Sequence, residues 1–133
     1  MSDNYLPTDY QAFIHKSRYA KYFDGNGREA YSETVSRYMD NVVRPAIKID
    51  NSYIKDIEQA ILNQDIMPSM RAMMTAGPAL DRDNTAGYNC SYLPVDDPKS
   101  FDEAMYILLC GTGVGFSVER QFISKLPEVP ELF

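Results

Sequence analysis

Two features in the second half of the chain could do chemistry: a cysteine, Cys90, and three alternate glycines, Gly111, Gly113 and Gly115. A thiol can act as a nucleophile, or pass electrons by pairing with a second thiol. Alternate glycines leave a length of backbone without side chains, on which a flat ligand could lie directly. Each feature also has a structural interpretation. A lone cysteine is often a small buried residue, and the glycines could form a helix C-cap and a tight turn.

The glycines do not match the common nucleotide-binding loops. A dinucleotide loop follows a strand and opens a helix, so that a phosphate meets the helix N-terminus. Here the order is reversed, because the glycines follow a helical pattern and precede an extended one. A Walker loop also fails, since no Gly-Lys-Ser/Thr follows the glycines.

The residues around Cys90 predict a strand followed by a helix. Residues 88–93 are rich in aromatic and apolar side chains, which is typical of a strand. Asp97-Pro98 then predicts a helix start, with an N-cap acid followed by proline at the first helical position. Ser100 and Glu103 form an overlapping capping box, so the sequence offers two helix starts that are one turn apart.

Gly111 predicts the end of this helix, and residues 115–118 predict a second strand. Apolar residues recur along the helix at three- and four-residue steps, and we expect them to form one buried face: Phe101, Ala104, Met105, Leu108 and Leu109.

The first half of the chain predicts three scaffold helices. The first begins at Thr8, with Gln11 as its capping partner. A second covers residues 28–43 and ends at Pro45, and a third covers residues 50–64. None of the three carries an arrangement that suggests chemistry.

Three other segments have simple interpretations. His15 is expected to be an exposed polar residue, because no Cys, Asp or second His lies at ligand spacing. Residues 67–74 are rich in methionine, which favours core packing over a plastic binding surface. Residues 75–84 combine Gly-Pro with Asp and Asn, which predicts a loop.

Composition limits the classes of function. The 133 residues make at most one domain with a modest core, and no apolar run approaches the length of a membrane span. The first residues lack the pattern of a signal peptide, so we predict a cytoplasmic protein. A net charge of -6 argues against polymeric DNA or RNA, whereas small nucleotides remain possible. Two cysteines and one histidine cannot make a zinc site unaided, so no metal site is predicted.

Several motifs, in this order along the chain, resemble the N-terminal part of the ribonucleotide reductase catalytic chain, most closely its adenosylcobalamin-dependent (class II) members. They are Pro68-Ser69, Arg71, Asn89-Cys90, Phe101-Asp102-Glu103, Gly113-Val114-Gly115-Phe116-Ser117-Val118, Arg120, Ile123, Ser124 and Pro127. The resemblance implies a mixed α+β and α/β fold. Residues 1–66 would be a helical N-terminal region, and residues 67–133 the first strand-helix-strand unit of a ten-stranded α/β barrel, left incomplete.

The resemblance also implies a reaction: replacement of the 2′-hydroxyl of a ribonucleoside di- or triphosphate by hydrogen, through cysteine-based radical chemistry. Cys90 matches the first cysteine of the reducing pair, whose two thiols give up two electrons and become a disulfide. The substrate-binding positions would be Ser69, Asn89, Cys90, Thr112 and Gly113, with Thr112 and Gly113 in a turn beneath the ribose or base.

Effector binding is less well supported. Asp97, or Asp96, matches an acid that holds an allosteric nucleotide in related reductases, although Asp97 also suffices as a helix N-cap. The dimeric, iron-dependent relatives have an arginine just after the second strand. Residues 121–123 occupy that place here without a clear match, which argues against effector binding and favours the cobalamin class. Cys110 falls where the family requires no cysteine, so we assign it to packing. A disulfide between Cys90 and Cys110 remains an alternative.

The family's radical-bearing cysteine, second reducing cysteine and cobalamin-contacting residues would follow Phe133. We therefore expect a split gene product, a truncated chain or the N-terminal piece of a longer protein, inactive alone. The implied partners are the remaining C-terminal portion, the ribonucleotide and a thioredoxin-type reductant, and the implied cofactor is adenosylcobalamin, bound mainly by that portion. The alternative is a non-catalytic assembly module or a nucleotide-binding module of the same fold.

Overall fold

The computed structural model describes residues 5–25, 27–47 and 51–129. The chain forms two compact units, Met1–Arg82 and Asp83–Phe133. Residues 67–82, which the sequence analysis groups with the barrel region, belong to the first unit. Each unit is therefore described by itself.

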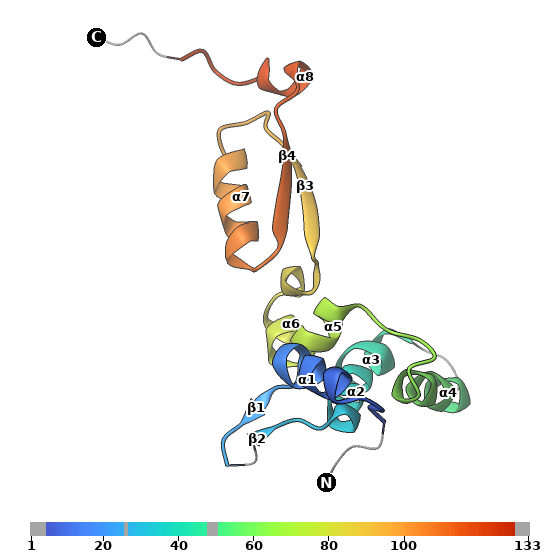
Figure 1. The fold of residues 1–133 in the computed structure, drawn as a ribbon. Helices are drawn as coiled ribbons and strands as arrows, with labels where there is room; N and C mark the ends of the chain where they lie inside the picture. The colour runs from blue at the N-terminus through green and yellow to red at the C-terminus, as the bar shows by residue number, and fades with distance from the viewer. Residues whose placement is uncertain (1–4, 26, 48–50, 130–133) are drawn as a thin grey trace. The chain divides into compact units, whose positions relative to one another are not determined.

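The first unit is mainly helical (Figure 1). Its helices are α1 (Asp9–Ile14), α2 (Tyr31–Tyr38), α3 (Arg44–Ala46), α4 (Asn51–Leu62), α5 (Met70–Thr75) and α6 (Pro78–Arg82). Two π-helical turns extend them, His15–Tyr19 after α1 and Met39–Val43 between α2 and α3. Strands β1 (Tyr22–Phe23) and β2 (Gly27–Arg28) form an antiparallel pair.

A capping box explains where the first helix begins, and strand pairing explains where the second one begins. Thr8 and Gln11 form the predicted capping box, because Gln11 N donates to Thr8 Oγ1 at 3.2 Å and Thr8 N donates to Gln11 Oε1 at 3.1 Å. The second helix begins later than predicted, at Tyr31, because Arg28 is paired in β2. Pro45 lies inside α3, and that helix ends one residue later.

The apolar periodicity of the second and third helices is confirmed in the core. That core consists of Tyr31, Val35, Met39, Val43, Ile54, Ile61 and Met73. From the methionine-rich segment Met73 is fully buried, whereas Met67 and Met70 are exposed. The first residue of the predicted third helix, Asp50, lies outside the described residues.

The prediction for His15 is wrong. Its side chain is buried, and its Nε2 lies 2.8 Å from Thr34 Oγ1. Thr34 in turn donates to Glu29, which is also buried and forms an ion pair with Arg37 at 2.7 Å. The histidine therefore belongs to a buried polar network that links α2 to the turn after α1, a contact that sequence spacing cannot reveal.

The predicted loop over residues 75–84 is also wrong in part, because it contains α6. Pro78 is the first residue of this helix, a position where its missing N–H costs nothing. Gly77 precedes it with a φ of +101°, a left-handed conformation that glycine adopts readily.

The second unit is a strand-helix-strand unit, as predicted. After a 3₁₀ turn at Asn84–Gly87 it contains β3 (Cys90–Pro94), α7 (Ser100–Leu109), β4 (Gly113–Ser117) and α8 (Arg120–Ile123). The two strands are parallel, with Cys90 opposite Gly113 and Pro94 opposite Ser117. Helix α7 lies alongside both strands (Figure 1). The described residues supply this one parallel strand pair, so the predicted barrel is not itself observed.

The apolar face predicted to be buried on α7 is instead exposed. Four side chains of this face are each more than half exposed to solvent: Phe101, Met105, Leu108 and Leu109. Leu109 is 79% exposed. A two-stranded sheet offers α7 little to pack on. Of the predicted face only Ala104 is half-buried, together with Ile107, which was not predicted. In the part of the chain that is described, no helix is both long enough and apolar enough to cross a bilayer.

Candidate functional site

The candidate site is the face of the β3–β4 pair that carries Cys90. Paired residues of parallel strands share a face, and successive residues alternate between faces. Cys90 and Tyr92 therefore share one face with Gly113 and Gly115, and all four are exposed. On the other face Ser91, Leu93 and Val114 are half-buried, and α7 contacts both strands. The cysteine face is thus open, and one of its two strands has no side chains at these positions.

Cys90 is a free, exposed thiol at the first residue of β3. The Gly113 N–H donates to Asn89 O at 2.9 Å, which fixes the backbone on either side of the thiol. A Cβ added to Gly113 would lie 3.3 Å from Asn89 O, a tight contact. Glycine therefore lets the two strands approach here, and it leaves the position opposite Cys90 without a side chain.

Both interpretations of the glycines hold, for different residues. Gly111 has a φ of +86° and follows Cys110, the C-cap of α7. Its N–H donates to Leu108 O at 2.9 Å, and Thr112 N–H donates to Ile107 O at 3.2 Å, which together form a Schellman C-cap. Gly111 therefore ends the helix, whereas Gly113 and Gly115 form the bare strand.

Thr112 is positioned by its side chain in a way that the sequence did not suggest. It is only 2% exposed, and its hydroxyl lies 2.7 Å from Thr85 O and 3.0 Å from Tyr88 O. These contacts hold the segment before Cys90 against the turn before Gly113. The hydroxyl is therefore used inside the protein, as is the Thr112 N–H, which donates to Ile107 O.

The other predicted site residues are differently placed. Asn89 is exposed and directly precedes Cys90 in the chain. Ser69 lies in the first unit, where its Oγ caps α5 by accepting from Ala72 N at 3.4 Å. Asp97 Oδ1 accepts from Lys99 N at 2.8 Å in the turn before α7, so it has the structural use that was the alternative.

A side-chain cluster in the second unit was missed. The hydroxyl of Tyr106 donates to Asp83 Oδ2, and the Cys110 thiol lies 4.0 Å from the same oxygen. The hydrogen bond from Tyr106 holds the pKa of Asp83 down at about 2, and in return raises the pKa of Tyr106 to about 12. No spacing in the sequence connects these residues. Cys110 is half-buried, and neither it nor Cys90 forms a disulfide.

Comparison with known proteins identifies one structural likeness. No protein-family model matches the sequence, and no curated protein matches it either. The structure is similar to the crystal structure of a B12-dependent (class II) ribonucleotide reductase, with a TM-score of 0.68 at 18% sequence identity. The match covers 89% of this chain and 21% of that protein, so the chain spans about a fifth of its length. The chain therefore has a fold similar to part of a class II ribonucleotide reductase.

Proposed function

We propose that this chain is the N-terminal part of a class II-type ribonucleotide reductase, supplying one reductant cysteine and part of the substrate site. It would act on ribonucleoside di- or triphosphates together with a remaining catalytic portion, and would be inactive without it. One observation carries the proposal: the exposed thiol of Cys90 stands directly opposite Gly113 on an open sheet face.

In this proposal Cys90 is one of two thiols that reduce the substrate. The ribose 2′-carbon loses its hydroxyl as water and gains hydrogen, while the two thiols lose two electrons and two protons and join as a disulfide. The second thiol belongs to the remaining portion, as does the cysteine that carries the radical. A thioredoxin-type reductant of the cytoplasm would then restore the two thiols.

The substrate would lie over the bare strand beside Cys90. Gly113 lets a sugar approach the backbone, and Asn89, the residue before Cys90, stays a proposed substrate contact. Ser69 and Thr112 stay predictions from the resemblance alone: the Ser69 hydroxyl caps α5 in the first unit, and both the hydroxyl and the N–H of Thr112 are engaged within the second unit. Asp97 remains a weaker proposal for an effector, since one carboxylate oxygen already caps a turn.

Adenosylcobalamin is the cofactor that the structural likeness suggests, but the described residues do not fit it. The one histidine of the sequence, His15, is buried against Thr34 and is not offered to a metal. We therefore assign the cofactor to the remaining portion and derive no step through it.

The test is reconstitution with the complementary chain that carries the other cysteines. Cys90→Ser should abolish deoxyribonucleotide formation while the two chains still assemble, because serine cannot store the electrons. Cys110→Ser is the matched control and should keep activity, since Cys110 is half-buried beside Asp83. Normal turnover by Cys90→Ser would overturn the catalytic proposal.

A second candidate function, a non-catalytic assembly module, is favoured by the exposed apolar face of α7. In that case the same reconstitution would show no change on Cys90→Ser. Charged substitutions on α7 would then be the ones that abolish function, by preventing assembly.

A further inference from the structure

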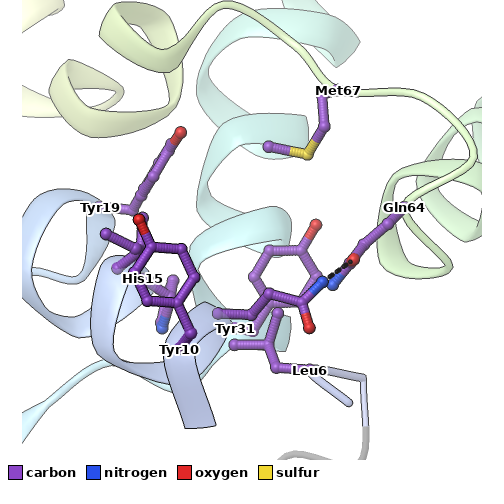
Figure 2. A pocket seen from close by; sticks show the side chains of 9 residues that line it. Leu6, Tyr10, His15, Tyr19, Tyr31, Gln64 and Met67 are labelled. Carbon is purple, nitrogen blue, oxygen red and sulfur yellow. Dashed lines mark hydrogen bonds between the residues drawn. The ribbon is translucent and has the colours of Figure 1, made fainter. Parts of the chain in front are cut away.

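The first unit contains an apolar pocket that the proposed function does not use. Its volume is about 240 Å³, and its walls include Tyr10, Tyr19, Tyr31, Leu6 and Met67. Figure 2 shows the side chains around the hollow, with Tyr10 and Tyr19 on one side, Gln64 on the other and Met67 above. No Lys, Arg, Asp or Glu is among the lining residues. Such walls favour a flat, neutral ligand that can lie against aromatic rings.

Two glutamine amides, Gln11 and Gln64, are among the polar groups of the pocket, beside the tyrosines and His15. Gln11 Nε2 donates to Gln64 Oε1 at 2.9 Å, and Gln64 Nε2 donates to Tyr5 O at 3.1 Å. An amide NH₂ has two hydrogens, so each glutamine keeps one N–H that these bonds do not use. Gln11 Oε1 already accepts from Thr8, which leaves the pair rich in donors. A ligand that matches it carries acceptors, such as ring carbonyls.

The backbone of Gln64 is a second, independent observation. Gln64 has a φ of +65°, the one non-glycine residue with positive φ in the described ranges. It is the left-handed residue of a Schellman cap on α4, since Gln64 N donates to Ile61 O at 3.1 Å and Asp65 N donates to Ala60 O at 2.9 Å. Glycine would be less strained at this position. What glutamine adds is the amide at the edge of the pocket.

We propose that this pocket binds a neutral heteroaromatic ring of nucleobase size that presents two carbonyl acceptors to the Gln11–Gln64 pair. The size follows from the volume, which lies below the roughly 300–1,000 Å³ of sites for drug-sized molecules. The lack of charge among the lining residues excludes recognition of a phosphate by these walls. The site shares no residue with the Cys90 face, so it stands whether or not the chain acts in a reductase.

The test uses the full 133-residue chain and two probes, caffeine and 1,3-dimethyluracil, which are flat and neutral, with two carbonyls and no N–H. Binding is followed by NMR of ¹³C-methyl methionine, in which Met67 lines the pocket while Met39 is buried in the core. We expect the Met67 signal to shift with probe concentration, and nuclear Overhauser contacts from probe ring protons to Met67. Benzyl alcohol, an aromatic without the two carbonyls, should bind about tenfold more weakly, the loss expected for about one hydrogen bond.

Two variants separate binding from folding. Tyr10→Ala removes a wall residue that is 72% exposed, and should weaken binding about fivefold or more. Phe13→Ala is its matched control, an exposed aromatic on the same helix that is not among the lining residues. Gln64→Gly removes the amide and relaxes the backbone, so binding should fall about tenfold while the melting temperature stays equal or rises.

The proposal is overturned if neither probe shifts Met67, or if benzyl alcohol binds as well as the probes do. It is also overturned if Phe13→Ala weakens binding as much as Tyr10→Ala. A shift confined to the core residue Met39 would show a general response of the fold, and would contradict the assignment as well.

Discussion

Cys90 and Cys110 have the same chemistry but different surroundings. Cys90 stands on an open sheet face, whereas Cys110 is half-buried with its sulfur near the Asp83 carboxylate. A reagent reaches an exposed thiol more readily than a half-buried one. Exposure therefore makes Cys90 the more reactive thiol.

We expect iodoacetamide to alkylate Cys90 several-fold faster than Cys110, because the reagent reaches the exposed thiol more readily than the half-buried one. Mass spectrometry of peptides from a time course measures both rates in one sample. Cys90→Ser should leave only the slow modification. Equal rates for the two cysteines would contradict the open face described for β3.

Asp83 sets the ionisation of Tyr106. The hydrogen bond to Asp83 raises the pKa of Tyr106 to about 12, from an ordinary value of 10.0. Asp83→Asn removes the charge that accepts this bond, so the pKa of Tyr106 should fall towards its ordinary value. A pH titration by NMR of ¹³C-labelled tyrosine measures it. Asp102→Asn, which removes a carboxylate from the same helix, should leave the Tyr106 pKa where it was.

Glu29 makes the stability of the first unit depend on pH. Burial alone would raise the pKa of Glu29, but hydrogen bonds from Arg37, from Lys21 N and from Thr34 outweigh it, so the pKa is lowered from 4.5. A lowered folded-state pKa stabilises the fold above the unfolded-state pKa, and this stabilisation is lost as pH falls through the folded-state value.

Glu29→Gln should therefore cost about 3–5 kcal/mol of unfolding free energy near neutral pH, because it leaves the guanidinium of Arg37, whose side chain is 11% exposed, without its charge partner. The difference from the unmodified protein should narrow as pH falls below about 4.5, where Glu29 of the unfolded chain becomes protonated, and on through the lower pKa of the folded state. Urea unfolding followed by circular dichroism at a series of pH values measures both. A difference that is constant with pH would show that the carboxylate charge does not contribute.

At the scale of elements, the two glycines of β4 make a matched pair. A Cβ on Gly113 would lie 3.3 Å from Asn89 O, whereas a Cβ on Gly115 would lie 3.5 Å from Ser91 O, an ordinary contact. Gly113→Ala should lower the unfolding free energy of the second unit by about 1 kcal/mol and shift the NMR signals of Asn89 and Cys90. Gly115→Ala should be neutral or stabilising by about 0.5 kcal/mol, since alanine loses less backbone entropy. Equal effects would contradict the close approach at Gly113.

Elements set by local rules were predictable from the sequence. The Thr8–Gln11 capping box, the apolar period of the third helix and the strand-helix-strand order all follow from residues close together in the chain. These signals need no knowledge of the partner element. Boundaries were less accurate, because Arg28 extends a strand pair and Pro78 opens a helix.

Contacts between distant residues could not be predicted. Thr112 bonds to carbonyls more than twenty residues away, and its sequence context gives no sign of this. The left-handed Gln64 breaks the rule that glycine occupies that cap. On α7 the apolar period was real, but periodicity does not say whether another element is present to cover the face.

For the whole molecule, the apolar face of α7 should govern association. Leu109 is 79% exposed and lies beside other exposed apolar side chains of this helix. Leu109→Lys should reduce self-association and weaken binding to the complementary chain, with little loss of folding stability, because it removes apolar surface that is already in water. Sedimentation velocity over a range of concentrations measures the first effect. Tyr22→Lys, at a similarly exposed apolar residue of the first unit, is the control and should change neither.

The pairing of β3 with β4 limits where residues can be inserted into the chain or deleted from it. Inserting or deleting one residue between Gly111 and Gly113 would shift the register of β4 by one residue, so that Thr112 or Val114 would lie opposite Cys90. The branched side chain of either residue would then crowd the sulfur. The same change within residues 96–99 falls in the connection before α7, which can absorb it without sliding one strand past the other. Insertions and deletions should therefore be tolerated in that connection and rejected in the second strand.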